Sequence, residues 1–162
     1  MTFIMNRADV FNAFSRYSFI GSSDVAKLLN IPMRKVLMFI EQGLVISKNP
    51  SVGTGSSRRF APADLIVFMV FNRLNDMGIA PRYLRSIANK INNIIRSGRL
   101  PSQLHITKGN GQTLHVGDPA FDDIVLTVPL SEIEKEVFDI LYGKKQNQPA
   151  NIISLVDDSW HI

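Results

Sequence analysis

The sequence predicts a mainly α-helical fold that ends in a small α/β segment. Between residues 19 and 99, apolar side chains recur three and four positions apart, and proline or glycine interrupts the pattern at short intervals. After residue 100 the composition shifts, and a Gly-Asn-Gly turn indicates a β-hairpin. We therefore divide the chain into an N-terminal helix (1–18), a helical domain (19–99), an α/β segment (100–143) and a tail (144–162).

The two halves of the chain carry opposite charge. Residues 1–100 hold 14 Lys and Arg against 5 Asp and Glu, whereas residues 101–162 hold 4 against 9. The net charge of +4 therefore conceals a basic half followed by an acidic one. A basic half indicates a polyanionic partner, because neutralising phosphates releases condensed counterions. An ordinary solvated surface is the alternative interpretation.

Composition argues against several classes of protein. Hydrophobic residues make up 45% of the chain, which is enough for a folded core. No window approaches about 20 uninterrupted apolar residues, so we expect no membrane contact. The absence of cysteine excludes disulfides and thiolate metal sites and fits a cytoplasmic protein. We find no glycine-rich phosphate loop, nucleophile elbow or metal motif, so we expect neither an enzyme nor a bound cofactor or metal.

Each of the first helices is predicted from its own signals. Residues 5–17 have the pattern of a short amphipathic helix. The next helix begins at Ser22-Ser23, with serine as the cap and Asp24 in the first turn, and it ends at Asn30-Ile31-Pro32. Pro32 suits the first turn of the following helix, which Gly43 closes. Two short helices joined by a three- or four-residue turn form a helix-turn-helix.

A β-hairpin and two longer helices are predicted to follow. Residues 44–46 and 58–60 have the pattern of two strands, and residues 47–57 between them are rich in Ser, Gly, Asn and Pro. Such a hairpin with a flexible tip is a wing. Beyond it, apolar side chains at helical spacing predict helices over residues 62–78 and 81–98.

The α/β segment is predicted to begin with a second hairpin, over residues 104–116. We prefer a three-residue loop, because it sets Ile106 opposite Leu114 and so pairs apolar with apolar side chains. The same register places His105 opposite His115. Two exposed or hydrogen-bonded histidines are the simpler interpretation, and a metal-binding or pH-responsive pair is the alternative.

The rest of the α/β segment is predicted as a strand and a helix. Residues 124–128 form the third strand, and Ser131 caps a helix from about residue 132 to 142. Three glutamates in the first turns of this helix suit the positive end of its dipole.

Six motifs between residues 19 and 97 follow one another in a characteristic order. They are Asp24-Val25-Ala26-Lys27-Leu28-Leu29-Asn30-Ile31, Arg34, Glu41-Gln42-Gly43-Leu44, Arg58-Arg59-Phe60, Asp64-Leu65 through Met77-Gly78, and the helix from Pro81 to Ile95. In order and spacing they resemble the mercury-resistance-regulator (MerR) family. The resemblance implies a winged helix-turn-helix domain that binds DNA as a homodimer.

The chain departs from this family at three points. Leu37-Met38-Phe39 stands where the family usually carries Arg-Tyr-Tyr, so one phosphate-contacting arginine and one tyrosine hydroxyl are missing. The wing is longer at its tip and rich in serine and glycine. The acidic α/β segment replaces the long dimerising helix of the family, and we expect it to supply dimerisation, a partner surface or a ligand site.

The resemblance and the helix positions together predict the residues that contact DNA. Arg34 and Lys35 lie in the first turn of the second helix, the part that enters a major groove, where arginine can bridge two acceptors on guanine. Arg58 matches a phosphate-contacting arginine of the family. Arg59 contacts DNA or, alternatively, pairs with an acid such as Asp64. The remaining candidates are Ser23 at a helix N-terminus, Met38 in the second helix, Lys48 near the wing tip, and Arg82 and Arg85 in the fourth helix.

These observations predict a sequence-specific transcription regulator that binds double-stranded DNA as a homodimer. The second helix would read the major groove, the wing would contact the backbone, and the resemblance implies distortion of promoter DNA. We expect a nucleoid-associated cytoplasmic protein of a bacterium or phage, with RNA polymerase or another protein as a partner of the acidic half. The alternatives are an architectural DNA-bending factor, similar to excisionases or to phage recombination and packaging accessories, and a protein-interaction adaptor.

Overall fold

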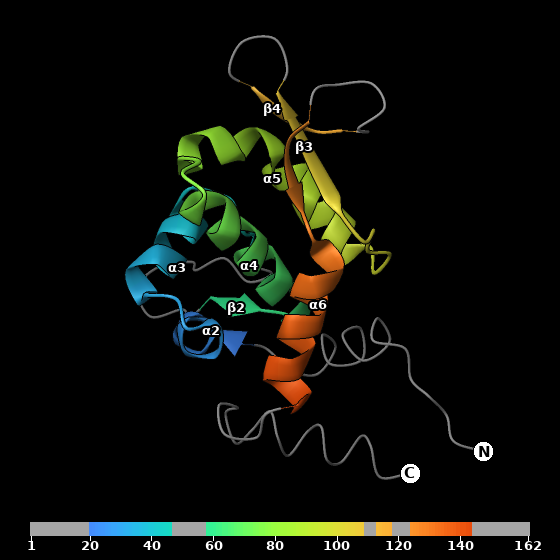
Figure 1. Cartoon of the computed structure of the whole chain (residues 1–162). Coiled ribbons are helices and arrows are strands. Elements are labelled where there is room, and N and C mark those ends of the chain that lie inside the picture. The colour runs from blue at the N-terminus through green and yellow to red at the C-terminus, as the bar shows by residue number, and fades with distance from the viewer. Residues whose placement is uncertain (1–19, 47–57, 109–112, 118–123, 144–162) are drawn as a thin grey trace, which may run out of the picture.

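The computed structural model describes residues 20–46, 58–108, 113–117 and 124–143 (Figure 1). The fold is mainly helical with a small antiparallel sheet, as the sequence predicts. The elements are β1 (Ile20–Gly21), α2 (Ser22–Leu29), α3 (Met33–Glu41), β2 (Arg59–Phe60), α4 (Pro62–Asp76), α5 (Pro81–Arg96), β3 (Leu104–Lys108), β4 (Leu114–Val116), β5 (Ile124–Val128), α6 (Leu130–Phe138) and the π-helix η1 (Asp139–Gly143). The predicted N-terminal helix, wing tip and tail lie outside the described residues.

The two predicted short helices are confirmed as α2 and α3. Asn30 adopts a left-handed conformation (φ 52°) that ends α2, and Pro32 precedes the first residue of α3. The predicted serine cap is wrong. The cap position of α2 is Gly21, so Ser22 and Ser23 lie inside the first turn, and neither serine side chain caps the helix.

The predicted strand at residues 44–46 is also wrong. Leu44 and Val45 are both buried, although successive residues of a strand point to opposite faces. The carbonyl groups of Leu44 and Ile46 accept hydrogen bonds from side chains of α5, and residues 44–46 pair with no described strand. β2 pairs instead with β1, with Phe60 opposite Ile20.

Helix α4 runs through the centre of the fold. Residues 64–71 are all buried, because α4 contacts α2, α3, α5 and α6 around its circumference. Phe68 meets Phe60 of β2 edge to face, with ring centroids 5.1 Å apart and an interplanar angle of 80°. Asp64 is the one buried acid of this helix, and its Oδ2 accepts a hydrogen bond of 2.9 Å from the backbone N–H of Ala61 at the N-cap.

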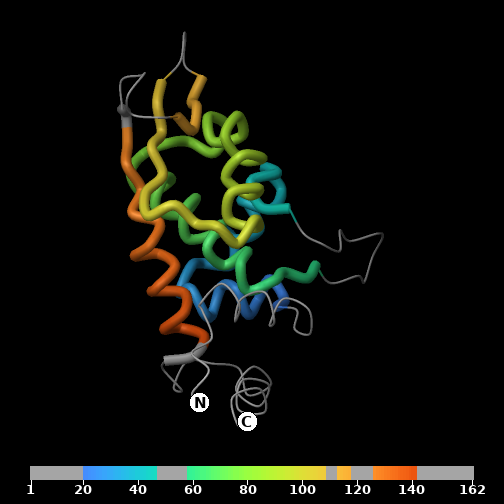
Figure 2. Tube along the Cα trace, turned by 90° about the vertical axis from the view of Figure 1, so that its right-hand side faces the viewer, coloured from blue at the N-terminus to red at the C-terminus, as the bar shows by residue number. Residues whose placement is uncertain are grey.

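The strands β3, β4 and β5 form an antiparallel sheet in the order β4-β3-β5. Figures 1 and 2 show this sheet toward one end of the molecule, α2 at the other end, and α4 between them. The outer edge of β4 faces α5. Ser86 and Lys90 of α5 donate hydrogen bonds of 3.1 Å to the carbonyl groups of Leu114 and Val116, which satisfies an edge that would otherwise be open.

The predicted register of the second hairpin is wrong by two residues. Ile106 lies opposite Val116, and Leu114 lies opposite Lys108. The prediction matched apolar residues between two strands only, whereas β3 is the central strand and receives apolar partners from β5 as well. Leu126 faces Ile106 from that side.

The corrected register separates the two histidines that the sequence placed opposite each other. His105 pairs with Thr127 of β5, and its Nδ1 lies 3.2 Å from the threonine hydroxyl oxygen. His115 is opposite Thr107 and exposed. The hypothesis of a histidine pair as a metal or pH-responsive site therefore loses its geometric basis.

Helix α6 joins the α/β segment to the helical domain. It begins one residue before Ser131, at the buried Leu130, so the predicted serine cap is wrong here too. Arg73 of α4 and Glu136 of α6 form an ion pair of 2.8 Å, and the buried residues of both segments belong to one continuous core. Within the described part of the chain, no helix combines the length and the apolar character that crossing a membrane requires.

Candidate nucleic-acid interface

Helix α3 presents one stripe of side chains to its surroundings and buries the opposite one. Val36 and Phe39 are fully buried against α2 and α4. The other stripe, at spacings of three, four and seven residues, consists of Arg34, Leu37, Met38 and Glu41. Arg34 and Glu41 are exposed, whereas Leu37 and Met38 are half-buried and Met38 packs against the core. These four residues, together with Pro32, Lys35 and Asn75, line a hollow on the surface.

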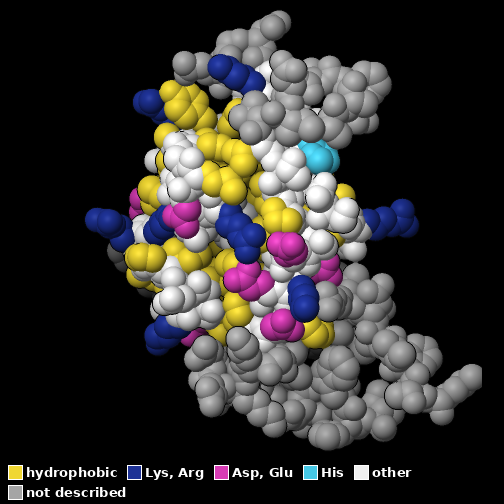
Figure 3. Space-filling view, viewed as in Figure 1, with side chains coloured by type: hydrophobic (Ala, Val, Ile, Leu, Met, Phe, Trp, Pro, Cys, Tyr) yellow, Lys and Arg dark blue, Asp and Glu magenta, His cyan; other side chains and the backbone are white. Residues whose placement is uncertain are grey.

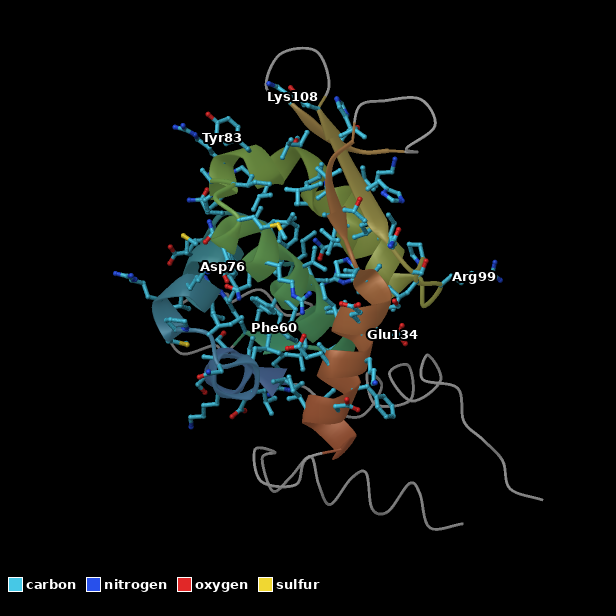
Figure 4. All side chains as sticks on the ribbon, viewed as in Figure 1. Phe60, Asp76, Tyr83, Arg99, Lys108 and Glu134 are labelled. Carbon is cyan, nitrogen blue, oxygen red and sulfur yellow. The ribbon has the colours of Figure 1, made fainter. Side chains whose placement is uncertain are left out.

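Arg34 and Lys35 are adjacent in the sequence, but their side chains have different surroundings. Arg34 is exposed in the first turn of α3, and no described residue forms a hydrogen bond or ion pair with its guanidinium. Lys35 turns back toward the body, where its Nζ lies 2.5 Å from Oδ1 of Asp76 and 5.9 Å from the ring centroid of Phe39. Asp76 lies close to α3 at the C-terminal end of α4 (Figure 4).

The two predicted cations of α5 also have partners. Arg82 is exposed, its guanidinium carbon lies 4.7 Å from the ring centroid of Tyr83, and its Nη2 donates to the tyrosine hydroxyl at 3.0 Å. Arg85 donates from Nη2 to the side-chain oxygen of Gln42, directly after α3. The structure thus brings Arg85 to the end of α3, whereas Arg82 lies one turn away beside Tyr83.

The other predicted contacts are distributed around α2 and β2. Arg58 is half-buried directly before β2, and Arg59 is exposed within it, opposite Gly21. Asp64, considered as a partner for Arg59, is held by Arg96 instead, with Nε–Oδ1 and Nη2–Oδ1 distances of 3.1 and 2.9 Å. Ser23 is exposed in the first turn of α2. Lys48 lies outside the described residues.

Sequence reasoning missed two side chains of α5 that contact the chain directly after α3. Asn92 is 1% exposed and donates to the carbonyl groups of Leu44 (2.7 Å) and Ala88 (2.8 Å). Arg96 donates to the carbonyl of Ile46 as well as to Asp64. The sequence could have indicated a structural role for Asn92, because it is a polar residue within the buried stripe of α5. Arg96 carried no such signal.

A group of acidic side chains lies on α6 and η1, in addition to Glu41 and Asp76 at α3. Those of α6 and η1 are Glu132, Glu134, Glu136 and Asp139, and acidic side chains lie over this helix in Figure 3. Lys and Arg side chains project along the edge of that view on the side of α2 and α3 (Figure 3).

No protein-family model matches this chain, and no curated protein matches it either.

Proposed function

We propose that the protein binds double-stranded DNA in a sequence-specific manner through the helix-turn-helix formed by α2 and α3, and that it regulates transcription as a homodimer. The observation that carries this proposal is the stripe of α3 that consists of Arg34, Leu37, Met38 and Glu41. It belongs to the second of two short helices joined by a tight turn, and it begins with an arginine that no described residue pairs.

The chemistry of the stripe suits the edges of base pairs in a major groove. An α-helix fits this groove, which is about 12 Å wide. The guanidinium of Arg34 can donate two hydrogen bonds to guanine, and Leu37 and Met38 offer apolar surface for thymine methyl groups. Glu41, at the far end, can accept a hydrogen bond from the amino group of cytosine. These contacts are directional, which favours sequence readout over a purely electrostatic association.

Phosphate contacts would come from cations outside α3. Arg58 and Arg59 flank the beginning of β2, Lys48 lies in the predicted wing, and Arg82 lies on α5. Such contacts fix the position of a protein on the duplex without reading the sequence. The acidic surface over α6 is unsuited to DNA and is the candidate surface for a second subunit or for RNA polymerase.

Selection of binding sites from a random duplex library tests the proposal. The purified full chain is incubated with the library at low salt, and the bound pool is sequenced. Enrichment of an inverted repeat is the expected result, because a symmetric dimer reads two half-sites related by a two-fold axis. Enrichment of direct repeats or of bendable A/T-rich DNA would favour an architectural factor. No enrichment at all would contradict DNA readout and leave a protein-interaction adaptor.

Replacing Asp76 by alanine is expected to strengthen DNA binding. The substitution releases Lys35 from its ion pair and removes an exposed carboxylate beside α3. We expect the slope of log K against log salt to steepen by about one, because one further phosphate contact becomes available. Stability should change by less than about 1 kcal/mol, since the pair is exposed on the Asp76 side.

Glu134→Ala is the matched control for Asp76→Ala. It removes the same charge from α6, away from α3 (Figure 4). Fluorescence anisotropy with a labelled duplex at several salt concentrations measures both variants. Equal slopes for Asp76→Ala and Glu134→Ala would mean that the loss of net charge alone explains the change, and that Lys35 does not reach DNA.

A further inference from the structure

The chain directly after α3 is held by side chains of α5. We call residues 42–46 the exit segment. Its three acceptors are the side-chain oxygen of Gln42 and the carbonyl groups of Leu44 and Ile46. Their donors, in the same order, are Arg85, Asn92 and Arg96, which we call the α5 polar stripe.

The spacing of the two sets is regular. The donors lie seven and four residues apart on α5, so they share one face of a helix with 3.6 residues per turn. The acceptors are every second residue of the exit segment. One face of α5 therefore contacts the exit segment over its whole length, from the residue directly after α3 onward.

The stripe is itself anchored in the core. Asn92 is 1% exposed, and a second hydrogen bond to Ala88 fixes the orientation of its amide. The guanidinium of Arg96 is held by Asp64, which is also 1% exposed. A buried carboxylate is stabilised by a hydrogen-bonded cation, so Asp64 restrains the same guanidinium that donates to Ile46.

We propose that the α5 polar stripe positions α3 for base readout without touching DNA itself, an inference that rests on the proposed DNA binding. Helix α3 has nine residues and is about 13 Å long. If its C-terminal end is released, a rotation of about 10° about the Arg34 end moves the released end, which carries Glu41, by about 2 Å. Directional hydrogen bonds to base edges tolerate a displacement of only about 0.5 Å. Loss of the stripe therefore removes selectivity between sequences, whereas general attraction to phosphates remains.

The test compares Arg96→Gln with Arg99→Gln. Both variants lose one positive charge near the end of α5, but the side chain of Arg99 points away from the body (Figure 4). Dissociation constants are measured for the selected duplex and for a scrambled duplex of equal length. For Arg96→Gln we expect the preference for the selected duplex to fall about tenfold. Its affinity for the scrambled duplex should change no more than that of Arg99→Gln.

Hydrogen exchange provides a readout that is independent of DNA. Arg96→Gln should accelerate amide exchange in residues 38–46 relative to Arg99→Gln, while exchange in α4 remains slow. Arg96→Lys, compared with Arg99→Lys, keeps the charge with fewer donors and should retain part of the preference. If Arg96→Gln does not fold, the comparison of Arg96→Lys with Arg99→Lys takes its place in the test.

Three results would overturn the inference. An equal loss of affinity for both duplexes would make Arg96 a simple electrostatic contributor. An unchanged preference in Arg96→Gln or Arg96→Lys would show that the stripe does not control α3. A wild-type protein that does not distinguish the two duplexes would remove the proposed function, and this inference with it. The first two outcomes leave the proposed function intact.

Discussion

Replacing Arg34 by alanine is expected to weaken binding to the selected duplex by about 5- to 150-fold, equivalent to about 1–3 kcal/mol. Arg34 is exposed at the start of α3 and can form a two-hydrogen-bond contact with guanine. The loss should be concentrated at one base pair of each half-site. The variant would then bind duplexes with any base at that position with similar affinity, because the group that discriminates among them is absent.

Arg99→Ala is the matched control for Arg34→Ala. It removes an exposed arginine three residues after α5, so both variants have the same net charge. Binding is measured against a panel of duplexes that vary one base pair at a time. If Arg34→Ala weakens binding to every member of the panel equally, Arg34 contacts phosphate and does not read a base. If both variants behave alike, α3 is not the reading element.

Replacing Phe68 by alanine is expected to destabilise the protein by about 3–5 kcal/mol. Phe68 is fully buried in α4, the helix that contacts four others, and its ring packs against that of Phe60. The substitution removes the transfer energy of the ring and leaves a cavity in the centre of the core. This loss is a large part of the about 5–15 kcal/mol that stabilises a typical domain.

Urea denaturation followed by circular dichroism measures the effect of Phe68→Ala. Phe68→Leu, which retains much of the volume, should lose less stability. Because β2 is held through Phe60, the variant should also loosen the pairing of Phe60 with Ile20 in β1. A loss below about 1 kcal/mol for Phe68→Ala would contradict the central place of α4 in the core.

The helices of this protein are predictable from sequence because the signals that define them are local. Helix α5 begins at the predicted Pro81. Of its predicted apolar stripe, Leu84, Ile87, Ala88, Ile91 and Ile95 are buried, Ile94 is half-buried, and Asn92 is buried in addition. Gly43 and Gly78, with φ of 73° and 98°, follow helices that end where the sequence predicts. A left-handed residue or a proline acts on its immediate neighbours, so no distant partner is needed to interpret it.

Two errors of sequence reasoning, the hairpin register and the strand after α3, have a common cause, which is competition from distant partners. The hairpin register of β3 depends on β5 as well as β4, and the residues after α3 are not a strand because Asn92, 48 residues away from Leu44, takes a carbonyl. Both serine caps were wrong for a different reason. Each helix begins before or at the serine, since the preceding segment already has the required backbone conformation.

The sequence by itself therefore determined the mainly helical class, the positions of the helices, the opposite charge of the two halves and the exposed arginine at the start of α3. Only the tertiary structure decided that Lys35 turns toward Asp76 and that Asn92 and Arg96 hold the exit segment. The reason is physical: helix propensity acts over three or four residues. The partner of a charged or polar side chain depends on which surfaces the whole chain brings together.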